Sequence, residues 1–199
     1  MTIQTSLGRT PLNRRGFLVS GAAVAGGFSL GFSVPFEAAH AAEVKEINAW
    51  VVIHPDDKVV IRIARSEMGQ GTLTGLAQLV AEELECDWTK VTTEYPTPGE
   101  NLKRNRVWKN YSTGGSRGIR ESNQYVREGG AMAREMLIAA AAAQWKVPAA
   151  ECSAANSVIT HKSGKKLTYG HLAAAAAKLE PPKEVKLRIP RTGRSPASP

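Results

Sequence analysis

The pattern of apolar and polar positions after residue 46 predicts two β-hairpins. Residues 50–53 and 59–63 are short runs rich in valine and isoleucine that flank a polar stretch with proline and aspartate. Residues 157–161 and 165–168 form a second pair of runs around a turn that contains Gly164. Short β-branched runs separated by turn-forming residues are typical of hairpins. We therefore expect antiparallel strands in both places.

Helical periodicity begins shortly after the first hairpin. Between residues 73 and 84, apolar side chains recur every three or four positions and form a single stripe. That spacing is typical of an amphipathic helix whose stripe faces the core. We expect the acidic residues near the end of this helix, Glu82, Glu83 and Glu85, to face water.

Three further elements complete the predicted fold. Residues 91–95 form a short β-rich run, and residues from about 120 to 145 form a helix with a small-residue face that includes Gly130. Small residues on a helix face permit close contact with a neighbouring element. Residues 172–179 are an alanine-rich helix. The order of hairpin, helix, strand, helix, hairpin and helix predicts an α+β fold in which helices pack on one face of a mixed sheet.

A glycine-containing turn joins the first hairpin to the first helix. Gly69 and Gly71 flank Gln70, and glycine accepts backbone angles that a Cβ atom forbids. The first turn of a helix leaves N–H groups without intrahelical partners, so a phosphate or a polar ring edge could dock there. Gln70 would add one acceptor and two donors. Many turns of this composition bind no ligand, so the turn alone leaves both interpretations open.

Residues 96–118 have no hydrophobic periodicity and end in a stretch of hydroxyl residues, glycines and an arginine. Loops of this length usually carry function or are disordered. Thr113, Ser116 and Arg117 could donate hydrogen bonds while the glycines let the backbone fold around an anion or a pterin. A flexible surface loop is the alternative, and this stretch alone does not decide between the two.

Most of the formal net charge of +8 lies in the two ends of the 199-residue chain. Basic residues outnumber acidic ones in residues 1–41 and 181–199, whereas residues 42–180 have mixed charge. One basic and aromatic cluster occurs at residues 103–109, and we interpret it as a solvated loop because no nucleic-acid-binding motif accompanies it. The charge pattern therefore predicts no nucleic-acid partner.

Cys86 and Cys152 are far apart in the sequence, with no Cys-x-x-Cys motif and no histidine at ligand spacing. The sequence therefore shows no motif for a metal or iron–sulfur site. The two thiols could form a disulfide in an oxidising compartment, or each could be buried as a small apolar residue. Both alternatives stay open.

The N-terminus has the features of a twin-arginine export signal. Arg14 and Arg15 precede a glycine- and alanine-rich run at residues 16–36, and Ala39-His40-Ala41 matches a small-x-small cleavage site. We therefore expect residues 1–41 to direct export to the periplasm, with only transient membrane contact. A short membrane anchor is the alternative, although the many glycines make the run a poor spanning helix. The twin-arginine route carries folded proteins, which suits a protein that takes up its cofactor before export.

Two motifs in a fixed order carry a resemblance to a known family. The first is Glu67-Met68-Gly69-Gln70-Gly71-x-x-Thr74, and the second is Thr113-Gly114-Gly115-Ser116-Arg117. The predicted apolar helix and strand lie between them. Over residues 50–187 the chain resembles the molybdopterin-binding large subunit of the xanthine dehydrogenase and aldehyde oxidase family, and in particular its isoquinoline 1-oxidoreductase beta-subunit branch.

The resemblance implies that the turn at residues 69–71 grips the pterin from one side. It implies that the loop at residues 113–117 grips the pterin and its dinucleotide extension from the other. Gly118 stands where some relatives carry another serine, so one side chain able to hydrogen-bond the pterin is missing. The candidate cofactor-binding residues are Gly69, Gln70, Gly71, Thr113, Ser116 and Arg117.

The resemblance also implies an activity and partners. Relatives hydroxylate a carbon of an N-heterocycle or an aldehyde, with water supplying the oxygen and molybdenum taking two electrons. Their glutamate base lies far beyond residue 199, so no residue of this chain is assigned as catalytic. The implied partners are an iron–sulfur small subunit and the remainder of the large subunit. Residues 42–187 would then be a partial molybdopterin-binding domain that is inactive alone.

The segment at residues 188–199 is rich in arginine, serine and proline, which predicts a disordered basic tail. A second interpretation is that this segment is written in a shifted reading frame and replaces a longer continuation. The alternative function is a stand-alone periplasmic binding or interaction module. Such a module would use the same turn and loop for a different phosphorylated ligand.

Overall fold

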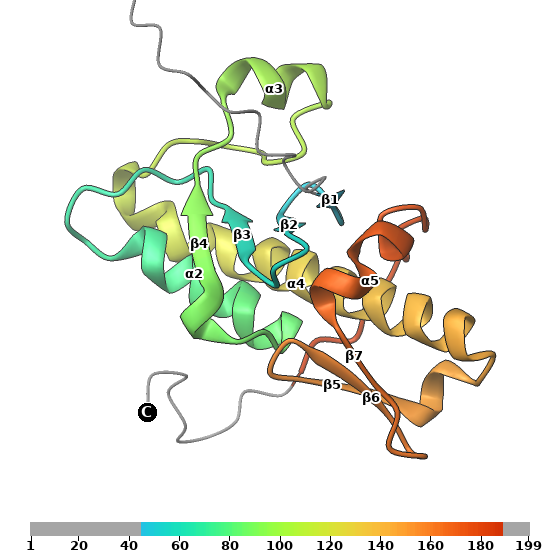
Figure 1. Cartoon of the computed structure of the whole chain (residues 1–199). Coiled ribbons are helices and arrows are strands. Elements are labelled where there is room, and N and C mark those ends of the chain that lie inside the picture. Colours follow the sequence, from blue (N-terminus) through green and yellow to red (C-terminus); the bar gives the residue numbers. More distant parts are fainter. Residues whose placement is uncertain (1–44, 189–199) are drawn as a thin grey trace, which may run out of the picture. The chain divides into compact units, whose positions relative to one another are not determined.

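The computed structural model describes residues 45–188 (Figure 1). The predicted export signal at residues 1–41 and residues 189–199 of the predicted tail lie outside these described residues. Within residues 45–188, no helix is both long enough and apolar enough to cross a membrane.

The first sheet is mixed. Its strands are β1 (Lys45–Glu46), β2 (Val51–Ile53), β3 (Val59–Arg62) and β4 (Val91–Glu94), in the order β1-β2-β3-β4. The first three strands pair antiparallel, and β4 pairs parallel to β3. Parallel neighbours need a crossover connection, which helix α2 (Thr72–Leu84) supplies. The predicted first hairpin and the strand that follows it are confirmed, whereas β1 was not foreseen.

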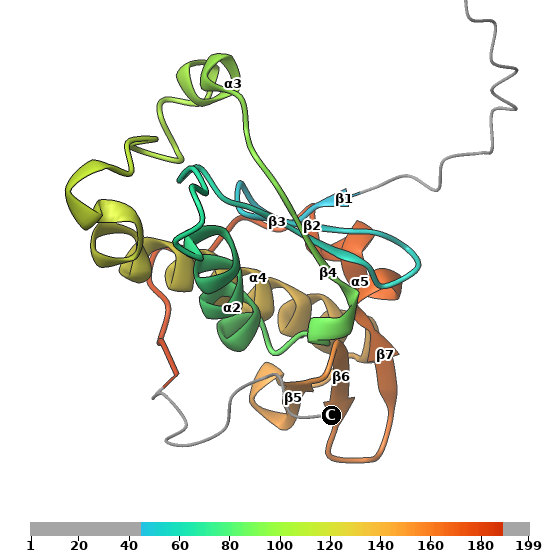
Figure 2. The same cartoon turned by 90° about the vertical axis from the view of Figure 1, so that its left-hand side faces the viewer.

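Helices α2 and α4 (Arg117–Trp145) lie on the same face of this sheet (Figure 2). The apolar stripe of α2 is buried: Leu76, Ala77, Val80, Ala81 and Leu84. A Cβ atom on Gly130 of α4 would lie 2.5 Å from the carbonyl oxygen of Val80, so the two helix backbones meet there. The predicted close contact of the small-residue face is confirmed, as is the α+β fold with helices on one face of a mixed sheet.

The second hairpin belongs to a separate antiparallel sheet. Its strands are β5 (Cys152–Ala155), β6 (Val158–His161) and β7 (Lys166–Thr168), and helix α5 (Tyr169–Ala176) follows. The predicted hairpin is confirmed, and β5 is an additional strand paired with β6. The hydroxyl of the buried Tyr169 donates to the carbonyl oxygen of Leu84 at 2.6 Å. That bond ties α5 to the end of α2.

The prediction that Glu83 faces water is wrong. Its side chain is 3% exposed and accepts two hydrogen bonds from Arg127, at 2.9 and 2.6 Å. Arg134 lies 3.6 Å from its second carboxylate oxygen, and the backbone N–H of Arg188 donates to that oxygen at 3.0 Å. The arginines of α4 neutralise the carboxylate in the interface between α2 and α4, which the pattern of α2 alone does not reveal.

The segment at residues 96–118 contains a short helix that was not predicted, α3 (Pro98–Lys103). It begins with a capping box, because Thr97 accepts from the N–H of Glu100 at 3.1 Å and Glu100 accepts from the N–H of Thr97 at 3.0 Å. The interpretation of residues 103–109 as a solvated loop is also wrong in part, because Trp108 is fully buried.

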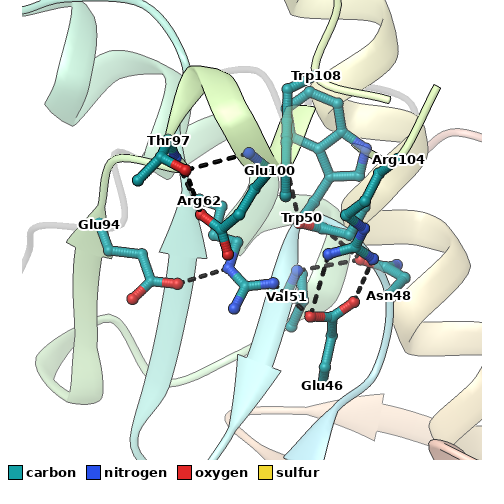
Figure 3. Close-up of polar contacts among 11 residues, drawn as sticks. Glu46, Asn48, Trp50, Val51, Arg62, Glu94, Thr97, Glu100, Arg104 and Trp108 are labelled. Atoms are coloured by element: carbon teal, nitrogen blue, oxygen red, sulfur yellow. Dashed lines mark hydrogen bonds and ion pairs between the residues drawn. The ribbon is translucent and has the colours of Figure 1, made fainter. Parts of the chain in front are cut away.

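Figure 3 shows how charged side chains connect β1, β3 and β4 with Arg104 and Trp108. Arg62 of β3 forms ion pairs with Glu46 of β1 and Glu94 of β4. Arg104 pairs with the same Glu46, and its guanidinium lies 4.9 Å from the ring centroid of Trp108. The indole N–H of Trp108 donates to the carbonyl oxygen of Ala49 at 2.9 Å. The basic cluster therefore serves the packing of this chain.

Candidate functional site

The turn between β3 and α2, here called the glycine turn (residues 66–71), has the backbone that its glycines predict. Gly69 and Gly71 have φ values of 91° and 77°, and an added Cβ atom would meet nothing within 4 Å at either. Glycine is needed there for its backbone angles. The turn is open to an approaching ligand on that side.

A carboxylate of the chain itself occupies the backbone donors of the glycine turn. Glu67 accepts hydrogen bonds from the N–H groups of Gly69 at 2.7 Å, Gly71 at 3.0 Å and Leu73 at 3.0 Å. The start of α2 is thereby satisfied by an internal anion. From the sequence, a ligand could dock at these donors or the turn could bind none, and Glu67 had no assigned role, although an acidic residue just before a helix is a recognisable signal.

The hydrogen bonds from Leu73 and Gly71 hold the pKa of Glu67 below its ordinary value of 4.5. A depressed pKa means that the ionised carboxylate stabilises the folded turn above pH 4.5 and that this stabilisation is lost as pH falls through the folded-state value. We expect Glu67→Gln to lower Tm at neutral pH and the deficit to shrink below pH 4.5. Thermal melts of both proteins across this pH range test it, with Glu82→Gln as the exposed control. A pH-independent deficit would contradict the assignment.

Gln70 is folded back onto its own turn. Its amide nitrogen donates to the carbonyl oxygen of Ser66 at 2.9 Å, and its amide oxygen accepts from the N–H of Met68 at 2.5 Å. The residue is exposed, so water or a ligand can compete for both groups.

The second candidate segment, here called the serine loop (residues 112–118), leads into α4. Gly115 and Ser116 have φ values of 67° and 56°, and Ser116 is the N-cap residue of α4 without a side-chain capping bond. The first turn of α4 has no acidic residue. Arg117 is exposed and lies 3.6 Å from Glu121. Unlike α2, this helix starts with backbone donors that no side chain within residues 45–188 caps.

The glycine turn and the serine loop meet at Ser66. Its carbonyl oxygen accepts a hydrogen bond from the side-chain amide of Gln70 and another, at 3.3 Å, from the hydroxyl of Thr113. A second contact joins the helix starts, because a Cβ atom on Gly118 would lie 2.9 Å from the side chain of Thr72. The structure thus brings together the two segments that the sequence analysis singled out.

The two cysteines are free thiols. Burial raises the pKa of Cys86 to about 12, so its thiol stays protonated and unreactive at neutral pH. Of the two alternatives left open by the sequence, the structure favours the buried thiol for Cys86. Within residues 45–188, no group of histidine, cysteine or acidic side chains is arranged to hold a metal ion.

A family model for a molybdopterin cofactor-binding domain matches residues 12–193. The chain is 35% identical over 172 residues to isoquinoline 1-oxidoreductase subunit beta from Brevundimonas diminuta, covering 82% of this chain and 22% of that protein. It is 31% identical over 175 residues to a membrane-bound aldehyde dehydrogenase (pyrroloquinoline-quinone) from Gluconacetobacter polyoxogenes, covering 82% and 21%. The chain therefore spans about a fifth of the length of these relatives.

Solved structures are also similar to the chain. Quinoline 2-oxidoreductase from Pseudomonas putida 86 matches with a TM-score of 0.47 and 20% identity, over 67% of this chain and 17% of that one. Reconstituted CO dehydrogenase from Oligotropha carboxidovorans matches with a TM-score of 0.46 and 24% identity, over 66% and 16%.

Proposed function

The chain belongs to the molybdopterin cofactor-binding domain family, and from this we propose that it forms part of the cofactor site of a molybdenum-dependent oxidoreductase. In this proposal the glycine turn and the serine loop contact the cofactor from two sides. Because the chain spans about a fifth of its relatives, the remaining contacts and the catalytic base belong to the rest of the large subunit.

The observation that carries the proposal is the difference between the two helix starts. At α2 the backbone donors already hold the carboxylate of Glu67, so an anionic group would be repelled. At α4 the donors have no side-chain cap among the described residues, and Ser116 and Arg117 lie beside them. A helix N-terminus with a neighbouring arginine is a favourable site for a phosphate. We therefore assign the phosphate-bearing part of the cofactor to the serine loop.

The glycine turn suits the polar edge of a pterin ring. The side-chain amide of Gln70 is hydrogen-bonded within its own turn. Exchanging those bonds for bonds to a ring edge costs little free energy, because the amide is hydrogen-bonded both before and after the exchange. Gly69 and Gly71 have no side chains that would obstruct the approach. Thr113 shares the carbonyl of Ser66 with Gln70, so it lies next to both segments.

When bound, molybdopterin supplies two-electron redox chemistry at its metal. The residues of this chain bind and orient it. We propose a dinucleotide form of the cofactor from the family resemblance alone. The substrates we propose, N-heterocycles or aldehydes, and the iron–sulfur partner follow from the family alone. We also propose export through residues 1–41 to the periplasm.

Exposed apolar residues near the two segments favour a part of a larger subunit over a stand-alone binding module. Met68 is 71% exposed, Tyr95 51% and Ile119 43%. Met68 lies in the glycine turn, Ile119 is in the first turn of α4, and the hydroxyl of Tyr95 accepts the N–H of Glu67 at 3.1 Å. Further domains of the large subunit would cover them. In a stand-alone module, the ligand alone would have to cover these side chains.

Replacing Arg117 with glutamine should lower the affinity of the chain for molybdopterin by about tenfold, which is the loss of one charge-assisted hydrogen bond. Gln70→Ala should lower it as well, since it removes the amide from the pterin side. Affinity is measured by the quenching of pterin fluorescence on titration with the 199-residue chain. Arg106→Gln, an exposed arginine outside both segments, serves as the matched control. Equal affinity of the Arg117 and Arg106 variants would refute the assignment of the phosphate to the serine loop.

A further inference from the structure

One arginine beside the site is buried. Arg65 follows β3, lies two residues before Glu67, and is 2% exposed. Its Nε donates to the hydroxyl of Ser122 at 2.9 Å, and one terminal nitrogen donates to the carbonyl oxygen of Ser112. Its other terminal nitrogen lies 3.5 Å from the carboxylate of Glu121. A single guanidinium therefore reaches the serine loop and α4 at once.

The partners of Arg65 are themselves held by the core. Ser122 is fully buried, and the hydroxyl of Tyr125 donates to it at 2.6 Å. The ring of Tyr125 packs against Trp50, with 5.2 Å between the ring centroids. This end of the guanidinium is thus fixed by the packed helix. The other end holds Ser112, an exposed residue at the start of the serine loop.

The residue after Arg65 is Ser66, whose carbonyl oxygen accepts hydrogen bonds from the side chains of Gln70 and Thr113. Arg65 and Ser66 therefore connect the glycine turn to the serine loop through one side chain and one backbone carbonyl. We propose that Arg65 is a positioning residue, which fixes the serine loop and the start of α4 relative to the glycine turn so that both can contact one cofactor. This inference rests on the proposed function.

The geometry of the guanidinium carries this role more than its charge does. Two of the three described partners of Arg65, Ser122 and Ser112, offer neutral oxygens. The third is the carboxylate of Glu121, which lies 3.5 Å away on a side chain that is 43% exposed. Arginine presents several donors in a rigid plane, whereas the ammonium of lysine is a compact charge that cannot reproduce the fork. Lysine at this position would keep the charge and lose the simultaneous bonds to Ser112 and Ser122.

Arg65→Lys tests the proposal in the 199-residue chain. Without cofactor, amide hydrogen exchange at residues 112–118 should become about tenfold faster as the loop opens more readily. The affinity for molybdopterin should fall by about tenfold, and Arg65→Met should lose no more affinity than Arg65→Lys. Arg62→Lys is the matched control, since it removes a guanidinium fork three residues earlier, at the end of β3, where the partners are Glu46 and Glu94. It should leave exchange at residues 112–118 unchanged.

Two results would overturn the positioning role. Wild-type exchange at residues 112–118 in Arg65→Lys would mean that Arg65 does not order the serine loop. Faster exchange with undiminished affinity would mean that the order it provides is not used by the cofactor. If the wild-type chain itself binds no molybdopterin, the proposed function fails, while the exchange experiment still decides whether Arg65 orders the loop.

Discussion

Replacing Glu83 with alanine is expected to lower the free energy of unfolding by about 3–5 kcal/mol, because it leaves the buried Arg134 and the partly buried Arg127 without their carboxylate. The side chain of Glu83 is 3% exposed, and those of Arg127 and Arg134 are 21% and 11% exposed. Denaturant-induced unfolding of the wild-type and variant chains measures the difference. Glu83 also accepts the backbone N–H of Arg188. The same substitution should therefore release the chain at Arg188 and make it more susceptible to cleavage by trypsin.

Glu82→Ala is the matched control for this prediction. Glu82 is the preceding residue on the same helix and is exposed, so its loss should change stability by no more than about 0.5 kcal/mol. Glu83→Gln should fall between the two, since it keeps the shape and some hydrogen bonds but removes the charge. Equal effects of Glu82→Ala and Glu83→Ala would contradict the account of Glu83 as a buried ion-pair residue.

Gly130→Ala is expected to cost about 3 kcal/mol, the upper part of the range for overpacking a core. The added methyl group would lie 2.5 Å from the carbonyl oxygen of Val80 and 3.1 Å from the Cβ atom of Glu83. The nearer atom belongs to the backbone of α2, so relief requires the two helices to move apart. Thermal and denaturant unfolding measure the cost.

Gly99→Ala provides the comparison for Gly130. Gly99 lies in the short helix α3, and the nearest atom to an added Cβ is the hydroxyl oxygen of Thr97 at 4.0 Å. Alanine there should be neutral or slightly stabilising, because it favours the helix. If both alanine variants have the same stability, the close contact between α2 and α4 at Gly130 is not a determinant of the fold.

Local patterns in the sequence predicted the elements that bury a regular apolar face. The stripe of α2, the small-residue face of α4 and both hairpins have such patterns, and all four are confirmed. β1 is a two-residue strand, Lys45–Glu46, and its pairing depends on β2 and not on its own composition. Helix α3 is polar and short, so it has no periodicity, although its capping box from Thr97 to Glu100 was readable.

The sequence predicted the backbone of the glycine turn but not the pairings of the side chains around it. The positive φ angles of Gly69 and Gly71 follow from the glycines themselves. That Glu67 fills the backbone donors of the turn, and that Arg65 holds the serine loop, depends on how a folded chain directs its side chains. The burial of Glu83 likewise depends on arginines of a helix distant in the sequence. Charged groups that are paired in three dimensions cannot be distinguished from solvated ones by spacing alone.

The central claim is that the glycine turn and the serine loop together bind molybdopterin. The most direct test is a titration of the isotopically labelled 199-residue chain with molybdopterin, followed by the NMR signals of its backbone amides. The account predicts saturable shifts concentrated at residues 66–72 and 112–118, which weaken in Arg117→Gln. A folded spectrum without shifts, or shifts concentrated elsewhere on the chain, would contradict it.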